Sequence, residues 1–191
     1  MKLQQVFNEE ENVALQKGIA FSKERKVGHD EQVLQVAKIL ADAGLKGHVW
    51  VFGDRSTHDD LKYGDLRVDD HKIDHKSMGS GGFFVSYRSA QGFEEEYYST
   101  LDRQSKPVFI DVRKNQIKSR ADQAEQKGDL KTANGFSSNN REEYKKNGYR
   151  IKIGTTPEGK DDWRDLGIRL PLSQVDYLTL EEFVKKMKDV S

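Results

Sequence analysis

YGDLRVDDHKIDHK, residues 63–76, gathers four Asp, three Lys or Arg and two His into one short segment. Leu66, Val68 and Ile73 are spaced among these charges. If the segment folds as a hairpin, successive side chains point to opposite faces, because the side-chain period of a strand is two. The stretch is then either a highly charged, solvated hairpin or a hairpin of which one face carries chemistry.

We predict a tight turn over residues 69–72, which places Asp65 opposite Lys76. One face of the hairpin then holds only charged side chains, namely Asp65, Arg67, Asp74 and Lys76. The other face holds the three apolar residues together with His75, which we interpret as a core histidine with satisfied hydrogen bonds. Packing of this second face against a helix would hold Asp65, Asp74 and Lys76 together on rigid strands.

Two carboxylates and an ammonium in one place have a use in phosphodiester hydrolysis. This reaction needs a divalent cation to neutralise charge on the phosphate and to activate water, and a hard cation such as Mg²⁺ prefers carboxylate oxygens. An ammonium group beside it can orient the attacking water and stabilise the transition state. Asp65 and Asp74 would hold the metal, and Lys76 would lie beside the nucleophile.

Hydrophobic periodicity predicts helices and strands in alternation along the rest of the chain, which is a mixed α/β pattern. The predicted helices are 3–25 with a break near Gly18, 29–44, 93–101, 116–127 and 179–190. The predicted strands outside the hairpin are 48–52, 83–89, 107–112, 149–153 and 167–172, and a polar turn is predicted over 54–60. Asp30 or His29 would cap the helix that Gly44 ends, and Thr179 would cap the last helix.

The pattern of Gly64-Asp65, a hairpin and then Asp74-His75-Lys76 resembles the PD-(D/E)xK nucleases, which include many restriction endonucleases, Holliday-junction resolvases and phage exonucleases. Their core runs in the order helix, three-strand meander, helix and fourth strand, and residues 30–112 supply elements in that order. The resemblance implies an α/β fold with a restriction-endonuclease-like core, a central mixed sheet flanked by helices. Residues 113–191 would then be a C-terminal elaboration of a single domain spanning 1–191.

The resemblance also implies roles for individual residues. Asp65 and Asp74 correspond to the metal ligands, Lys76 to the lysine beside the nucleophile, and the cofactor would be Mg²⁺ or Mn²⁺. The family often adds an acid from the first helix, for which Glu31 is the matching candidate and Glu24 a weaker one. The chain departs from the family in having Gly-Asp where Pro-Asp is common, and in an insertion that separates Lys76 from the next helix. An acid two residues before a lysine recurs along the chain, but only the match at Asp74 is paired with a second acid in a hairpin.

Length and composition set the broad class. The chain has 191 residues, of which 35% are hydrophobic and 34% charged, with nine Phe, seven Tyr and two Trp, so we expect one folded domain. Cysteine is absent, which excludes disulfides and thiolate metal sites. No signal peptide and no apolar run of the roughly 20 residues that a membrane span needs are found, so we expect a cytoplasmic protein without a membrane partner.

The net charge is +0, but residues 101–160 hold 14 Lys or Arg against 8 Asp or Glu. This excess fits a protein that binds a polyanion, although two ordinary solvated surfaces would give the same counts. The candidates for contacts with DNA phosphates are Arg67, Arg88, Lys114, Lys118 and Arg120. We therefore expect a metal-dependent nuclease acting on DNA, and since relatives that cut both strands commonly act as dimers, a homodimer is compatible with this. The alternative is a nuclease-like fold used as a non-catalytic module that binds nucleic acid or protein.

Two other motifs are weaker. SMGSGG, residues 77–82, lacks the Gly-Lys-Ser/Thr ending of a phosphate-binding loop, so we interpret it as a turn beside the site. His71 and His75 are four residues apart, but His71 falls in the expected turn and no second pair accompanies them. The histidines therefore do not predict a zinc site.

Overall fold

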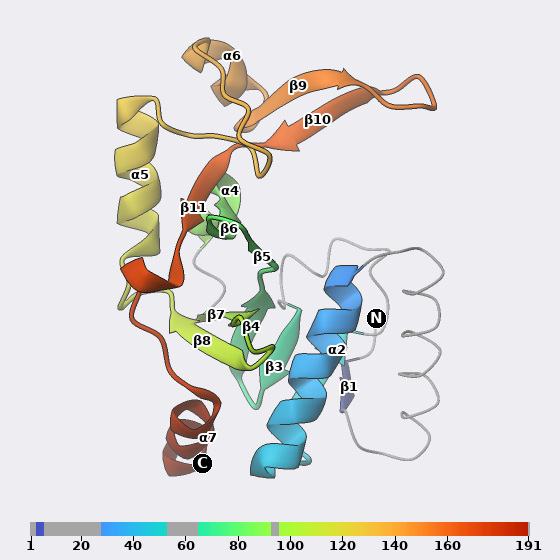
Figure 1. Cartoon of the computed structure of the whole chain (residues 1–191), viewed down its shortest axis with the longest axis vertical. Coiled ribbons are helices and arrows are strands. Elements are labelled where there is room, and N and C mark those ends of the chain that lie inside the picture. The colour runs from blue at the N-terminus through green and yellow to red at the C-terminus, as the bar shows by residue number, and fades with distance from the viewer. Residues whose placement is uncertain (1–2, 6–27, 53–64, 93–95, 191) are drawn as a thin grey trace. The chain divides into compact units, whose positions relative to one another are not determined.

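The computed structural model describes residues 3–5, 28–52, 65–92 and 96–190, and its elements are shown in Figure 1. The chain divides into two compact units. Unit 1 comprises Met1–Ser77, Glu94–Asp111 and Asp176–Ser191, and unit 2 comprises Met78–Phe93 and Val112–Val175. Helices and a mixed sheet confirm the α/β class, whereas a single domain spanning 1–191 stays a prediction.

Unit 1 is built on a six-stranded sheet in the order β1-β2-β3-β4-β7-β8. Its strands are β1 (Leu3–Gln5), β2 (Val49–Phe52), β3 (Leu66–Val68), β4 (His71–His75), β7 (Tyr97–Leu101) and β8 (Pro107–Asp111). β4 and β7 run parallel, and every other neighbouring pair is antiparallel. Because hairpin connections cannot join parallel strands, the chain must cross over between β4 and β7, and residues 78–92 lie in this crossover.

The charged hairpin forms as β3 and β4, but its turn lies one residue earlier than predicted. Leu66 pairs with Ile73 and Val68 with His71, so the turn consists of Asp69 and Asp70 alone and the predicted turn over 69–72 is wrong. Asp69 has a positive φ of 48°, which Asp tolerates better than most residues, and its Oδ1 lies 2.9 Å from Nδ1 of His48. The register differs from the prediction by two residues, so each side chain stays on its predicted face.

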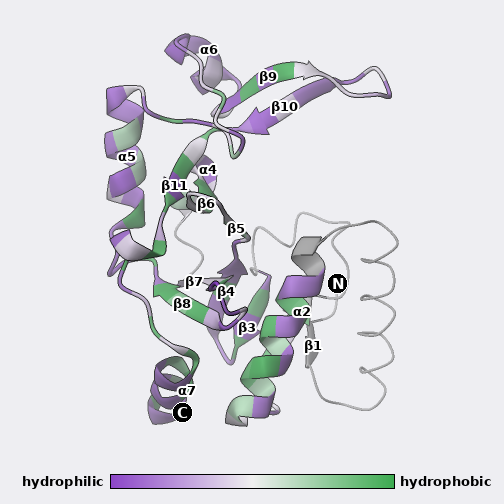
Figure 2. Ribbon diagram, in the orientation of Figure 1, coloured by the Kyte–Doolittle hydropathy of each residue, from purple (hydrophilic) through white to green (hydrophobic). Residues whose placement is uncertain are grey.

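The apolar face of the hairpin lies in the core of unit 1. Helix α2 (Gly28–Leu40), its continuation η1 (Ala41–Leu45) and helix α7 (Leu180–Val190) contribute to the same core, and Figure 2 shows the hydrophobic stripe along α2. The buried members are Val33, Val36, Ala37, Leu40, Ala41, Leu45, Val49, Val51, Leu66, Val68, Ile73, Tyr97, Phe109, Phe183, Val184 and Met187. Burial of this stripe, rather than helix propensity, stabilises helices of this length.

The predicted cap of α2 is wrong, because the helix begins at Gly28, and His29 and Asp30 lie within it, whereas two other helix ends follow their predicted signals. Gly44 adopts a φ of 114° inside η1, a conformation that favours glycine, so the helical run stops there as predicted. At the start of α7, the Thr179 hydroxyl accepts from the Glu182 N–H at 3.3 Å, while the Glu182 carboxylate accepts from the Thr179 N–H at 2.8 Å. This reciprocal pair is a capping box, and it confirms Thr179 as the cap.

The helix predicted over 93–101 is wrong, because residues 97–101 form strand β7. Tyr97, Tyr98, Ser99 and Thr100 are all buried between β4 and β8. The three glutamates before them favour a helix locally, but aromatic and β-branched side chains suit a strand that is buried on both faces. Tertiary packing therefore outweighs the local preference. The predicted strand 107–112 is confirmed as β8.

Unit 2 contains a three-stranded antiparallel sheet, a separate β-hairpin and short helices. The sheet has the order β11-β6-β5, from β5 (Met78–Gly79), β6 (Gly82–Ser86) and β11 (Gly167–Leu170). The hairpin consists of β9 (Arg150–Thr155) and β10 (Asp161–Asp165), and the helical segments are α4 (Tyr87–Gly92), α5 (Ile117–Lys127), α6 (Arg141–Lys146) and η2 (Leu172–Gln174). The helix predicted over 116–127 is confirmed, whereas the strand predicted over 83–89 ends at Ser86 because α4 begins there.

The glycine-rich segment 77–82 is explained by packing against Arg169 of β11. The Arg169 Nη1 donates to the Gly82 carbonyl at 2.7 Å, and a Cβ on Gly81 would lie 2.9 Å from Cδ of Arg169. Gly82 itself has a φ of 114° and abuts the Leu170 backbone. The glycines therefore admit an arginine side chain, which accounts for the segment without a phosphate ligand.

Some predicted segments fall outside the part of the chain that the structure describes. The polar turn over 54–60, Glu24 and most of the helix predicted over 3–25 lie there, while Leu3–Gln5 is strand β1 rather than helix. Within the described ranges, none of the helices has the length and hydropathy to cross a membrane.

Candidate functional site

The charged face of the β3–β4 hairpin brings Asp65, Asp74 and Lys76 together. The Nζ of Lys76 lies 2.5 Å from Oδ2 of Asp74, and the two side chains are only 16% and 18% exposed. Asp65 Oδ2 accepts a hydrogen bond of 2.8 Å from the backbone N–H of His75, which lies between Asp74 and Lys76. The predicted convergence of two carboxylates and an ammonium is therefore present, and these three residues are the candidate site.

The pKa of Lys76 is raised above its ordinary value. Burial by itself lowers the pKa of this ammonium, but attraction to Asp74, to Tyr98 and to Asp65 outweighs the desolvation. The Lys76 Nζ also lies 5.0 Å from the centroid of the Tyr98 ring, a cation–π contact. Asp74 and Tyr98 are paired across the parallel strands β4 and β7, so both partners of Lys76 are held by the sheet. Lys76 is thus a fixed positive charge at neutral pH.

The third acid that the sequence predicted is Glu31. It is exposed in the first turns of α2, and the described residues contain no group of three or more Asp, Glu or His side chains placed to hold a metal ion. The neighbouring residue Gln32 contacts the hairpin through a 2.8 Å hydrogen bond between its Oε1 and Nε2 of His75. The structure therefore brings Asp65, Asp74 and Lys76 together, and the role of Glu31 as a ligand stays a prediction.

His75 has the buried environment that the sequence predicted. It is 1% exposed, and its Nδ1 lies 3.0 Å from the hydroxyl of Ser99 on β7. Gln32 and Ser99 were missed by sequence reasoning. The sequence did carry a signal for Gln32, because it precedes Val36 by four residues and is therefore a polar residue in the apolar stripe of α2.

The five candidates for phosphate contacts lie in different surroundings. Arg67 is half-buried on the charged face of the hairpin, and its Nε has no hydrogen-bond partner in the described part of the chain. The other four belong to unit 2. Lys118 pairs with Asp122 at 3.1 Å, Arg120 donates to the Gln174 carbonyl at 2.8 Å, and Arg88 lies 3.8 Å from Asp165.

Lys114 is exposed. In unit 2 as a whole, basic residues outnumber acidic ones, with 15 Lys or Arg against 9 Asp or Glu and a net charge of +6. The net charge of the whole chain is +0, so unit 1 carries −6. The basic segment that the sequence indicated is thus concentrated in one compact unit.

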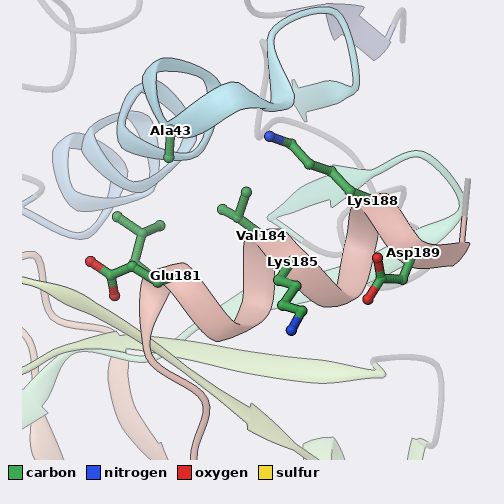
Figure 3. Close-up of a pocket in the computed structure, with 7 residues that line it drawn as sticks. Ala43, Glu181, Val184, Lys185, Lys188 and Asp189 are labelled. Atoms are coloured by element: carbon green, nitrogen blue, oxygen red, sulfur yellow. The ribbon is translucent and has the colours of Figure 1, made fainter.

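A cavity of about 400 Å³ lies elsewhere in unit 1, between η1 and α7. Figure 3 shows Val184 and Lys188 of α7 directed toward the segment that carries Ala43, while Lys185 and Asp189 point the other way. None of the predicted site residues lines this cavity. It is therefore separate from the candidate site on the hairpin.

Comparison with known proteins identifies no relative of this chain. No family model matches the chain, and neither a curated protein nor a solved structure matches it. The function is therefore argued from the residues and their geometry.

Proposed function

We propose that this protein is a metal-dependent nuclease that hydrolyses phosphodiester bonds in DNA. The observation that carries the proposal is the convergence of Asp65, Asp74 and Lys76 on one face of a hairpin whose other face is buried. Half-buried charges are costly to maintain in a core sheet unless they are paired or used. A plain solvated hairpin does not require two acids and a lysine to be this shielded from water.

The order of elements supports a restriction-endonuclease-like core. Helix α2 is followed by the antiparallel meander β2-β3-β4, then by a crossover that contains β5, β6 and helix α4 of unit 2, and then by β7, which is parallel to β4. Apart from the two inserted strands β5 and β6, this order is compatible with the helix, meander, helix and fourth strand that the resemblance to the PD-(D/E)xK nucleases implies. The fourth strand is β7, however, rather than the predicted 107–112, and the helix is α4 rather than 93–101.

The donor set fits a hard divalent cation. Asp65 and Asp74 offer carboxylate oxygens, the ligand type that Mg²⁺ and Mn²⁺ prefer, and both come from ordered strands or their immediate ends. A bound cation would supply charge neutralisation at the phosphate and activation of water. Asp74 is paired with Lys76 in this structure, so a cation bound there would share the Asp74 carboxylate with the Lys76 ammonium.

The raised pKa of Lys76 restricts its role. Because the ammonium stays protonated at neutral pH, Lys76 is suited to hold negative charge on the phosphate and to orient a water molecule by donating to it. It is poorly suited to remove a proton from that water as a general base. Arg67 projects from the same face of the hairpin as Asp65, and an arginine there can contact the adjacent phosphate.

The charge of unit 2 supports a polyanionic substrate. A net charge of +6 in one compact unit favours binding to a phosphate backbone through long-range attraction, independent of sequence. DNA is the polyanion that the resemblance favours, and binding should weaken steeply as salt is added. A homodimer remains part of the proposal for a substrate that is cut on both strands.

The test is cleavage of supercoiled plasmid and branched DNA with Mg²⁺, with Mn²⁺ and with EDTA. Asp74→Ala and Lys76→Ala should abolish metal-dependent cutting. Asp70→Asn is the matched control, since Asp70 is an exposed acid in the turn of the same hairpin, and it should cut like the wild type. No cutting by the wild type on any substrate, with no calorimetric signal for Mn²⁺, would refute the nuclease assignment.

One observation favours a second candidate function. The short ion pair between Lys76 and Asp74 satisfies both charges within the protein, as in a structural site. The protein would then be a nuclease-like fold that binds nucleic acid or protein without catalysis. The same assay separates the two functions, because the module would retard DNA in a gel without cutting it and would do so equally well in EDTA.

A further inference from the structure

A chain of hydrogen bonds, buried at His75 and Ser99 and partly buried at Gln32, runs from α2 through β4 to β7 on the face of the hairpin opposite the candidate site. His75 is its centre, with Gln32 on one ring nitrogen at 2.8 Å and the Ser99 hydroxyl on the other at 3.0 Å. The Gln32 Oε1 also accepts from the hydroxyl of Ser77 at 3.4 Å. We name Gln32, His75 and Ser99 the polar relay.

The donors and acceptors of the relay can be assigned from its chemistry. The Gln32 Oε1 is only an acceptor, so the Nε2 of His75 carries a proton and donates to it. The Ser99 hydroxyl can then donate to Nδ1 of a neutral ring. Both ring nitrogens of His75 are therefore satisfied in a core that is otherwise apolar, which avoids the penalty of an unpaired buried polar group.

The relay is coupled to the candidate site through the backbone of β4. The peptide N–H of His75 donates to Asp65 Oδ2 at 2.8 Å, so the residue that anchors the relay also holds the first acid. Asp74, on β4, and Lys76, directly after it, flank His75 in the chain. The next peptide N–H, that of Lys76, donates to the carbonyl of Ser99 at 2.8 Å, so Ser99 holds β4 by its main chain and by its side chain.

An apolar side chain at position 75 would pack here without these directional requirements. Hydrogen bonds of fixed geometry instead specify one arrangement of α2, β4 and β7, because a slip of any element leaves a buried polar group unpaired. The polar relay therefore fixes the position of β4 relative to α2 and β7, and with it the positions of Asp74 and Lys76. It also fixes the orientation of the Asp65 carboxylate beside them.

We propose that Gln32 and His75 are positioning residues for the Asp65–Asp74–Lys76 site, acting through the β4 backbone rather than by contact with substrate. This inference rests on the proposed function for its consequence in catalysis. Partners that orient the ligands of a metal site typically contribute about 10- to 100-fold in metal affinity or activity. Gln32 is then a residue of α2 that serves the site.

The experiment compares Gln32→Met with Gln32→Glu and with Gln35→Met. Met keeps the size and helix propensity but removes the acceptor for His75, and Glu restores an acceptor. Gln35 is exposed on the same helix, so Gln35→Met is the control for the substitution itself. The readouts are the Kd of Mn²⁺ by calorimetry, the Mn²⁺ concentration for half-maximal cleavage, and the midpoint of thermal unfolding.

Gln32→Met should raise the Kd of Mn²⁺ and the half-maximal concentration about 10-fold, while it stays folded at the assay temperature. Gln32→Glu should recover most of this loss, and Gln35→Met should match the wild type. Unchanged Mn²⁺ affinity in folded Gln32→Met would overturn the proposal. If Gln32→Met does not fold, Ser99→Ala takes its place, because it breaks the other end of the polar relay.

A metal-free readout separates this inference from the proposed function. The Lys76 ammonium is shielded and paired, so its ¹H–¹⁵N signal should be visible by NMR in the wild type. If the wild type neither binds Mn²⁺ nor cuts DNA, the nuclease assignment fails, and the positioning role is decided by this signal alone. Its loss in Gln32→Met but not in Gln35→Met supports positioning, and its persistence in Gln32→Met overturns it.

Discussion

The ion pair between Asp74 and Lys76 can be measured by a double-mutant cycle of Asp74→Asn, Lys76→Met and the two together. The atoms lie 2.5 Å apart and the side chains are 16% and 18% exposed, so water screens them only in part. Two unit charges about 4 Å apart attract by about 4 kcal/mol at an effective dielectric constant of about 20, and desolvation offsets part of this. We expect a coupling free energy of about 2 kcal/mol, within the range found for residues in direct contact.

Urea unfolding at pH 7 measures this coupling, with Asp70→Asn as the control for removing an acid from the same hairpin. The raised pKa of Lys76 fixes the sign of its pH dependence. A group whose pKa is higher in the folded state contributes its stability in full below its ordinary value of 10.5, and loses it as the pH rises through the raised value. The coupling should therefore be constant from pH 6 to 9. A coupling below about 0.5 kcal/mol would show that the two charges are independent and would refute the reasoning.

Adding Mg²⁺ extends the same experiment to the proposed cation site. Lys76→Met leaves the Asp65 and Asp74 carboxylates without their ammonium, so a divalent cation should stabilise this variant more than it stabilises the wild type. At about ten times its Kd, a ligand that binds only the folded state adds about 1.4 kcal/mol. Equal effects of Mg²⁺ on Lys76→Met and on the double variant, which lacks Asp74, would contradict the assignment of Asp74 as a ligand.

Three further predictions concern stability and are read by thermal or urea unfolding. Phe183→Ala should cost about 3–5 kcal/mol, because this fully buried ring stacks at 4.0 Å on an aromatic ring of β8, and a loss below about 1 kcal/mol would contradict its place in the core. Gly82→Ala should cost more than about 2 kcal/mol, because its φ is 114° and its Cβ would overlap the backbone of β11, whereas Gly154→Ala, with open space around it, should be near neutral. The Arg141 guanidinium lowers the pKa of buried Glu125, so this contribution is present above the ordinary value of 4.5 and lost as the pH falls through the lowered value. In Glu125→Gln the free energy of unfolding should therefore fall less steeply at acid pH than in the wild type. The same acid dependence in both proteins would argue against a stabilising Arg141–Glu125 pair.

The faces of the hairpin could be predicted from the sequence because they depend on alternation and on an even number of residues in the loop. Leu66 and Ile73 share a face for any such loop, so the error of two residues in the register changed neither face. The turn itself could not be placed, because it is fixed by the positive φ of Asp69 and by His48, which lies 21 residues away. Local signals therefore gave the composition of the site and not its exact pairing.

The other errors have the same origin in long-range contacts. Residues 97–101 form a strand because they are buried between β4 and β8. The three glutamates that precede them favour a helix, so the local sequence does not indicate this strand. The contact between Gln32 and His75 spans 43 residues, so no pattern in either segment could pair them. Likewise, the association of residues 78–93 with 112–175 in one unit follows from β6 pairing with β11, which has no local signature.

The division of unit 1 into three stretches of chain has a consequence for the timing of folding. Its sheet is completed only when β7 and β8 are available, and its core only when Phe183 of α7 stacks on Phe109. During synthesis from the N-terminus, α2 and the β3–β4 hairpin must therefore wait for residues more than 100 positions later before their apolar face is covered. Contacts of such large sequence separation form slowly, because loop closure precedes the gain from packing. The hairpin of the candidate site is thus synthesised early, but its apolar face is buried late. We expect chains that stop before α7 to leave this face exposed, and therefore to aggregate and to be cleaved by proteases.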